Sequence, residues 1–367
     1  MASPFTTAGV GPKLTRVINS EARLAEWLPS LENATWLAID TEADSLHAYP
    51  EKLCLLQIGV PAGNRLIDPL AGLDLKPLLA ALKPHTLILH GGDYDMRMLR
   101  KDLDFVPTAV FDTMLAARLL GIREFGLTHL LSHFLGIKLE KGPQKANWAR
   151  RPLTPRMEAY ALNDIAHLWP LSNLIRDALK AKGRLAWHEE MCQRLIADNS
   201  FVPPPDPDMV WRIKGSRHLP PRALAVLKEL WLWREREAVA ANRPPYFILS
   251  SEIVIALAAA SLDASKSLDG LLPKHLTPRR RRGILDAIQH GRKAHPLPSV
   301  IRVRATPPTE ASKRRFAELE KRRNQRATEL DMDPTVIASR ATLAALAQDW
   351  DEASQDLMKW QRDLLIG

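Results

Sequence analysis

The sequence predicts an α/β domain built on a mixed sheet, followed by all-helical modules. Short apolar runs separated by Gly, Pro and Asn fill the first part of the chain, and amphipathic helical patterns follow them. Strands first and helices after are typical of such a domain. A proline-rich stretch, 200–211, then breaks the pattern, and only helical periodicity comes after it. The chain's 367 residues, of which 46% are hydrophobic, suffice for a sizeable core.

The first domain is expected within residues 1–200. Its strands are short apolar runs bounded by turn-forming residues, and its helices repeat apolar side chains every three or four positions. Thr154 and Pro155 mark a helix start, because threonine caps a helix and proline fits the first turn. Strands are predicted at 36–40, 53–60, 65–68 and 85–92, the first three as a meander, and helices at 75–83, 93–103, 113–121, 127–136 and 154–183.

Two helical modules are predicted beyond the proline-rich break, at 211–293 and 308–367. A second proline-containing segment, 294–310, separates them. In both modules a helix rich in Arg or Lys precedes a short helix with Ser near its start. The modules therefore share an order of features without an exact repeat.

Charge and cysteine content restrict the partners and the compartment. Residues 1–200 contain 23 basic and 22 acidic side chains, whereas the remainder contains 28 and 20. A basic attachment beside a neutral body favours a polyanion such as nucleic acid, with a merely soluble basic surface as the alternative. Cys54 and Cys192 are too few for a disulfide framework or a zinc cluster, so we expect a reducing, cytoplasmic compartment. No apolar leader or membrane span is expected, and hence no membrane partner.

Three short patterns carry the chemical signal. Asp40 and Glu42 end the first predicted strand, where residues two apart share one face. Asp95 follows a later strand and lies in a predicted helix, and Tyr160 and Asp164 share one helix face at a spacing of four. Neighbouring carboxylates repel one another, and a hard divalent cation is the usual remedy.

Four carboxylates and a tyrosine in this arrangement can enclose two divalent cations. Such a pair of cations serves phosphodiester hydrolysis, because one lowers the pKa of the attacking water and the other stabilises the departing 3′ oxygen. Oxygen ligands favour Mg²⁺ or Mn²⁺. A tyrosine is a poor base at neutral pH, so Tyr160 is expected to orient the water. The predicted metal ligands are Asp40, Glu42, Asp95 and Asp164.

These motifs, in this order, resemble the three exonuclease motifs of the DEDD superfamily in its tyrosine-containing branch. The stretches 49–59, 111–121, 126–141, 147–154 and 160–171 resemble ribonuclease D, the region from Trp211 to about His290 resembles its HRDC domain, and the last segment resembles a second, divergent HRDC domain. Ala43 and Asp44 follow Glu42, where the family often has Phe. Asp93 lies near Asp95, and the family spacing from His90 selects Asp95.

The resemblance implies an RNase H-like exonuclease fold, 3′-to-5′ hydrolysis that releases nucleoside 5′-monophosphates, and trimming of RNA such as tRNA precursors. It implies two Mg²⁺ or Mn²⁺ ions. The sequence leaves the oligomeric state open, and a monomer is expected. A DNA exonuclease and an inactive nucleic-acid-binding protein on the same fold remain alternatives. Comparing the degradation of matched RNA and DNA strands tests the DNA exonuclease alternative, and a calorimetric metal titration tests the inactive-protein alternative.

Other polar residues have simpler expected roles. His90 is predicted to pack or hydrogen-bond near its strand end, Asp68 and Asp112 to cap turns or helices, and Asp44 to lie at the surface or beside the site. Trp231 and Trp233 are predicted in the core. Basic runs at 278–283 and 313–326 are expected to contact the RNA backbone. The candidates for holding the substrate strand are Lys141, Lys145, Arg150 and Arg151.

Overall fold

The computed structural model describes residues 16–140, 142–263, 267–274, 276–298 and 308–366. The chain forms two compact units. The first contains the described residues of Met1–Ala43, Leu53–Phe201 and Glu318–Gly367, and the second contains those of Asp44–Lys52 and Val202–Ala317. No helix among the described residues combines the length and apolar character needed to cross a bilayer.

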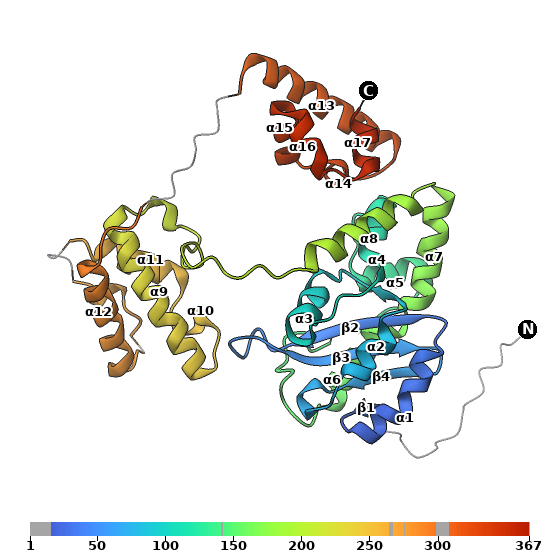
Figure 1. Ribbon diagram of the computed structural model, residues 1–367, viewed down its shortest axis with the longest axis horizontal. Coiled ribbons are helices and arrows are strands. Elements are labelled where there is room, and N and C mark those ends of the chain that lie inside the picture. The colour runs from blue at the N-terminus through green and yellow to red at the C-terminus, as the bar shows by residue number, and fades with distance from the viewer. Residues whose placement is uncertain (1–15, 141, 264–266, 275, 299–307, 367) are drawn as a thin grey trace, which may run out of the picture. The chain divides into compact units, whose positions relative to one another are not determined.

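A six-stranded mixed sheet forms the centre of the first unit (Figure 1). The strand order is β1-β4-β3-β2-β5-β6. The chain pairs β2, β3 and β4 antiparallel in succession, which confirms the predicted meander, and β5 and β6 continue the sheet in parallel. The strands are β1 (Val17–Ile18), β2 (Leu37–Ala43), β3 (Leu53–Val60), β4 (Gly63–Ile67), β5 (Thr86–Leu89) and β6 (Ala109–Asp112).

Helices flank this sheet, as the predicted α/β class requires. The segment predicted as helical over 154–183 divides at His167, because Pro170 has no N–H to donate to the carbonyl of Ala166. Two strands, β1 and β6, were not predicted, since two and four residues give no clear alternation. The helices are α1 (Glu21–Glu32), α2 (Lys76–Leu82), α3 (Asp93–Leu103), α4 (Thr113–Leu119), α5 (Leu127–Leu135), α6 (Pro155–Ala166), α7 (Leu168–Ala181) and α8 (Leu185–Asn199).

The alternation of side chains along β2 decides which face carries the polar residues. Leu37 and Ile39 point into the larger core, which they share with Trp27 and Leu31 of α1. Ala38 therefore faces the other way, together with Asp40 and Glu42. That face is covered by α6: a Cβ built on Gly59 of β3 would lie 3.6 Å from both Ala38 Cβ and Ile165 Cδ1. The helix that carries Tyr160 and Asp164 thus packs on the face that carries Asp40 and Glu42.

The second unit is helical apart from the segment Asp44–Lys52. Its core gathers Trp211 and Trp233, and Trp231 packs against it, as predicted. The backbone N–H of Tyr49 donates to Asn242 Oδ1 at 3.2 Å, which ties the short segment to the helices. The elements are η2 (Ser216–His218), α9 (Pro221–Ala241), α10 (Pro245–Ile248), α11 (Ser251–Ala260), η3 (Asp269–Leu271) and α12 (Pro278–Lys293).

The last helices are α13 (Glu310–Glu329), α14 (Pro334–Ile337), α15 (Arg340–Gln348), α16 (Trp350–Ala353) and α17 (Lys359–Leu365). From Glu318 onward they belong to the first unit, although the sequence predicts a separate module from 308. Trp360 stacks on Trp187 of α8 with ring centroids 4.9 Å apart. Gly121, at φ +87°, approaches so closely that a Cβ there would lie 1.9 Å from the carbonyl oxygen of Asp331, so only glycine fits.

Candidate active site

A pocket of about 870 Å³ opens in the first unit where β2, α3, α5 and α6 meet. All five predicted site residues line it: Asp40, Glu42, Asp95, Tyr160 and Asp164. They come from three segments that are far apart in the sequence. We call the four carboxylates, Asp40, Glu42, Asp95 and Asp164, the acidic cluster.

Strand β2 presents two members of the acidic cluster on one face. One carboxylate oxygen each from Asp40, Glu42 and Asp164 lie within 4.8 Å of one another. Gln57 of β3 is paired with Asp40 in the sheet register, and its Nε2 lies 3.4 Å from Asp40 Oδ2. The Gln57 side chain is fully buried, and no described residue bonds its Oε1. Gln57, which the sequence did not single out, therefore helps to orient Asp40 from the neighbouring strand.

Helix α3 supplies Asp95 from its first turn. The hydroxyl of Thr41, on the opposite face of β2 from Asp40 and Glu42, donates to Asp95 Oδ1. Asp93 points elsewhere: it forms an ion pair with Arg97 at 2.8 Å, and its side chain is 62% exposed. Of the two aspartates in this motif, the structure places Asp95 in the pocket and leaves Asp93 outside it.

Helix α6 supplies Tyr160 and Asp164 one turn apart. The Thr154 hydroxyl accepts a hydrogen bond from Met157 N and Pro155 takes the first helical position, so the predicted helix start is confirmed. The phenol of Tyr160 interacts with the Asp164 carboxylate, which adds to burial in raising the pKa of the tyrosine. Its ring lies beside Trp148, with centroids 6.1 Å apart, and against the backbone of Gly142, where a Cβ would lie 1.6 Å from Tyr160 Cδ2. Gly142, which the sequence did not single out, lets the loop close on the tyrosine.

Burial and mutual repulsion raise the pKa values of the acidic cluster. Loss of hydration is the largest cause for each member. It raises the pKa of Glu42 to about 9 and that of Asp164 to about 7, in each case with a contribution from Asp95. The pKa of Asp95 rises only to about 6, because the Thr41 hydrogen bond opposes the shift. The pKa of Asp40 rises well above its ordinary value.

The donor set fits divalent cations. Among the described residues that line the pocket there is no lysine or arginine, so none of them offers the acidic cluster a cationic side chain. Three of its oxygens are already close enough to share an ion. Hard oxygen donors with uncompensated negative charge suit Mg²⁺ or Mn²⁺ and do not suit a thiolate-binding metal.

Three other predicted roles are confirmed. Asp68 caps η1 (Pro69–Ala71) and Asp112 caps α4, each with its side chain accepting backbone N–H groups. His90 Nδ1 lies 2.9 Å from Thr113 Oγ1, so His90 is hydrogen-bonded at the end of its strand. It also lines the pocket.

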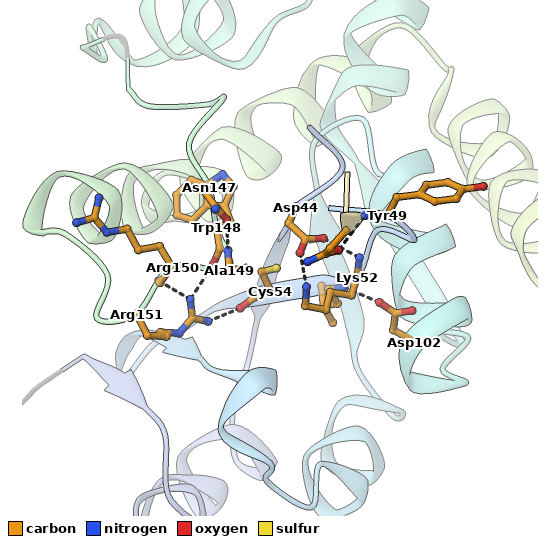
Figure 2. Close-up of polar contacts among 12 residues, drawn as sticks. Asp44, Tyr49, Lys52, Cys54, Asp102, Asn147, Trp148, Ala149, Arg150 and Arg151 are labelled. Atoms are coloured by element: carbon orange, nitrogen blue, oxygen red, sulfur yellow. Dashed lines mark hydrogen bonds and ion pairs between the residues drawn. The ribbon is translucent and has the colours of Figure 1, made fainter. Parts of the chain in front are cut away.

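Two predictions require correction. Of the two positions predicted for Asp44, the one at the surface is wrong: Asp44 is fully buried, because its carboxylate accepts the Lys52 N–H at 2.9 Å and pairs with the Lys52 ammonium (Figure 2). Arg151 is not available to hold a substrate strand. Its guanidinium pairs with Asp68 and donates to the Cys54 carbonyl at 2.6 Å (Figure 2), so it holds the fold together.

The remaining candidates for holding the substrate strand are Lys145 and Arg150, which are exposed, whereas Lys141 lies outside the described residues. The basic run at 278–283 lies at the start of α12 in the second unit. Within it Arg279 and Arg280 pair with Glu237, and Arg281 pairs with Asp269.

Comparisons with known proteins agree with this geometry. A family model described as 3′-5′ exonuclease matches residues 15–180, and one described as HRDC domain matches residues 223–288. Ribonuclease D of Zymomonas mobilis is 36% identical over 247 residues, which are 66% of this chain and 63% of that protein. Ribonuclease D of a Shewanella species is 31% identical over 299 residues, which are 79% of this chain and 76% of that protein.

The crystal structure of Escherichia coli RNase D, described as an exoribonuclease involved in structured RNA processing, has the same fold. It superposes with a TM-score of 0.73 at 23% identity, over 95% of this chain and 96% of that one. The chain thus spans 63% and 76% of the two curated relatives and nearly all of the solved structure.

Proposed function

This chain belongs to the ribonuclease D family of 3′–5′ exoribonucleases, and we propose that its acidic cluster is the site where nucleotides are removed from RNA 3′ ends. One observation carries the proposal. Four carboxylates from three distant segments converge in one pocket beside Tyr160, and no described lysine or arginine lines that pocket. Repelling anions persist together where an external cation offsets them.

Asp40, Glu42, Asp95 and Asp164 would hold two divalent cations, Mg²⁺ or Mn²⁺. When bound, such a pair lowers the pKa of the attacking water and stabilises the charge on the departing oxygen. Thr41 and Gln57 assist by fixing Asp95 and Asp40 in the orientation that the fold gives them. Chemistry of this kind depends on positioning within a few tenths of an ångström, and both supporting residues lie on strands of the sheet.

Tyr160 would orient the attacking water. Burial raises its pKa, and the nearby carboxylates of Asp164, Glu42 and Asp40 raise it further. The phenol therefore stays protonated at neutral pH and cannot serve as a general base. Its hydroxyl can donate or accept a hydrogen bond at a fixed place, since Trp148 and the backbone of Gly142 confine the ring.

The proposed substrates are structured RNAs with a single-stranded 3′ end, tRNA precursors among them. Basic side chains exceed acidic ones by eight in residues 201–367, which supports contacts to an RNA backbone. The exposed Lys145 and Arg150 lie on the loop before α6 and could bind the strand close to its end. Neither Cys54 nor Cys192 forms a disulfide and both are buried, which is consistent with action in the reducing cytoplasm.

The test is digestion of a 5′-labelled RNA that carries a hairpin and a 3′ tail, with Mg²⁺ and with or without a chelator. The expected result is stepwise shortening from the 3′ end with release of nucleoside 5′-monophosphates, and no shortening with chelator. Asp95→Asn should be slower by at least about a thousandfold, whereas the neighbouring Asp93→Asn should retain activity within about threefold. Equal losses in the two variants, or equal digestion of a matched DNA strand, would contradict the proposal.

A further inference from the structure

His90 lines the same pocket as the acidic cluster, and the proposed hydrolysis does not use its side chain. It follows β5 directly, one residue beyond Leu89, and its side chain is partly buried. Two observations determine which ring nitrogen of His90 carries the proton. One is the hydrogen bond of its Nδ1 to Thr113, and the other is the hydrogen bond that Thr113 makes in turn.

The Thr113 hydroxyl determines which nitrogen of His90 carries the proton. Thr113 is fully buried, and its Oγ1 donates to the carbonyl oxygen of Leu89 at 3.1 Å. A carbonyl oxygen can only accept, and a hydroxyl has one proton to give. Toward His90 Nδ1, at 2.9 Å, the Thr113 oxygen must therefore accept. Nδ1 consequently carries the proton, and Nε2 has a lone pair.

The second nitrogen of His90 is an acceptor that opens on the pocket. Burial lowers the pKa of His90, which keeps the ring neutral. No described residue forms a hydrogen bond with Nε2. Nε2 is nevertheless not a buried, unsatisfied atom, so its lone pair is accessible. The carboxylates of the acidic cluster also line the pocket, but the proposed cations would engage them; Glu140 lines the pocket as well and is charged. Nε2 is thus a neutral acceptor left for the substrate.

We propose that His90 Nε2 accepts a hydrogen bond from a hydroxyl group of the 3′-terminal ribose, which makes His90 a specificity-determining residue. The inference rests on the proposed function. A nucleotide brings three kinds of donor to such a site: ribose hydroxyls, exocyclic amines, and the ring N–H groups of uracil and guanine. The base donors differ in type and position between the four bases, whereas the ribose hydroxyls are the same in all of them, so a residue that serves every 3′ end must use a hydroxyl. If the donor is the 2′-hydroxyl, the contact also distinguishes RNA from DNA.

The experiment uses three oligonucleotides that differ only at the last residue: all-RNA, terminal 2′-deoxy and terminal 3′-deoxy. Release of the first nucleotide is measured under single-turnover conditions with Mg²⁺. The wild type should release one of the two deoxy residues roughly tenfold more slowly than the ribonucleotide, as expected for one lost hydrogen bond. The deoxy substrate that is released more slowly identifies the hydroxyl that His90 contacts.

Two variants of His90 separate this role from a structural one. In His90→Asn the amide reaches the position of Nδ1 and keeps the contact with Thr113, but nothing occupies the position of Nε2. This variant should be roughly tenfold slower on all-RNA and indifferent to the deoxy substitution. In His90→Gln the amide oxygen can take the place of Nε2, so the discrimination should return. A purely structural role would slow all three substrates alike.

The outcomes distinguish the two proposals. If the wild type does not shorten the all-RNA strand, the proposed function fails and this inference fails with it. If the wild type shortens all three strands at one rate, or if His90→Asn keeps the wild-type discrimination, only the role of His90 is overturned.

Discussion

The first unit contains two groups of buried or half-buried carboxylates, and they differ in what offsets their charge. Asp68 accepts the Leu70 N–H and both Nε and Nη2 of Arg151, at 3.0, 2.6 and 2.7 Å. Asp112 accepts the backbone N–H groups of Gly91, Gly92, Met114 and Leu115. The acidic cluster has no ion pair with any described residue, although its members lie side by side.

This difference separates carboxylates that pair with described groups of the fold from those for which we propose an external cation. Donors within the chain fully engage Asp68 and Asp112, which join segments 83 residues apart and fix the turn that carries His90. The members of the acidic cluster repel one another and keep elevated pKa values until a cation arrives. Burial alone does not mark a functional carboxylate, whereas a cluster of buried carboxylates without an ion pair to a described residue does.

The largest expected effect is on turnover. Asp164→Asn should lower kcat by at least about a thousandfold, because it removes a ligand of the proposed cations. Asp68→Asn should leave kcat per folded molecule within about threefold, because Asp68 acts on stability only. Both are measured on the same RNA after correction for the folded fraction. Comparable losses in the two variants would remove the distinction between the groups.

The next effect is on stability, and it has a matched control. Arg151→Met should lower the free energy of unfolding by about 3 kcal/mol, because Asp68 stays buried without its partner. Arg150→Met changes the exposed neighbour and should cost less than about 0.5 kcal/mol. Urea denaturation with linear extrapolation measures both. A small loss of unfolding free energy for Arg151→Met would show that the buried Asp68 carboxylate does not depend on the ion pair with Arg151.

A smaller effect concerns the metal-free protein and pH. The pKa of Asp164 is raised to about 7 in the folded state, so the folded state binds more protons than the unfolded one. The stability this contributes is complete below the ordinary carboxyl pKa and is lost as the pH rises through about 7. At pH 8 with chelator, Asp164→Asn should therefore melt about 3 °C above the wild type. A lower melting temperature would contradict the repulsion.

The smallest effect has the opposite sign. His188 is buried, its Nε2–H donates to the Asp112 carbonyl at 2.9 Å, and burial lowers its pKa. The unfolded state takes up a proton first, so stability present above about pH 6.5 falls as the pH drops, by at most about 1.4 kcal/mol per pH unit. Replacement of His188 by Gln should reduce this slope in urea midpoints between pH 7 and 5.5, whereas replacement of the exposed His133 should not.

The sequence could predict the acidic cluster because its spacing follows local rules. Residues two apart share a strand face and residues four apart share a helix face, so Asp40 with Glu42 and Tyr160 with Asp164 form pairs before any tertiary contact is known. The mixed sheet followed from the order of apolar runs. Asp95 needed the family spacing to be chosen over Asp93, since both lie in the first turn of one helix.

Contacts between distant segments could not be predicted in this way. In the sequence Arg151 lies beside other basic residues and has no evident partner, and only the fold brings Asp68 to it. Asp44 was expected at the surface or beside the site, yet its carboxylate is buried in an ion pair with Lys52. Gln57 and Gly142 are ordinary residues of a strand and a loop until Asp40 and Tyr160 lie against them. In each case the contact depends on the tertiary fold, and no local sequence pattern indicates the partner.

The central claim is that the acidic cluster binds two divalent cations, and Mn²⁺ tests it most directly. Crystals of the protein soaked with Mn²⁺ should show two anomalous scattering peaks between Asp40, Glu42, Asp95 and Asp164, about 3.5 to 4 Å apart. Crystals of Asp40→Ala treated in the same way should show fewer peaks. Absence of any peak at the acidic cluster in the wild type, with Mn²⁺ bound elsewhere, would contradict the account.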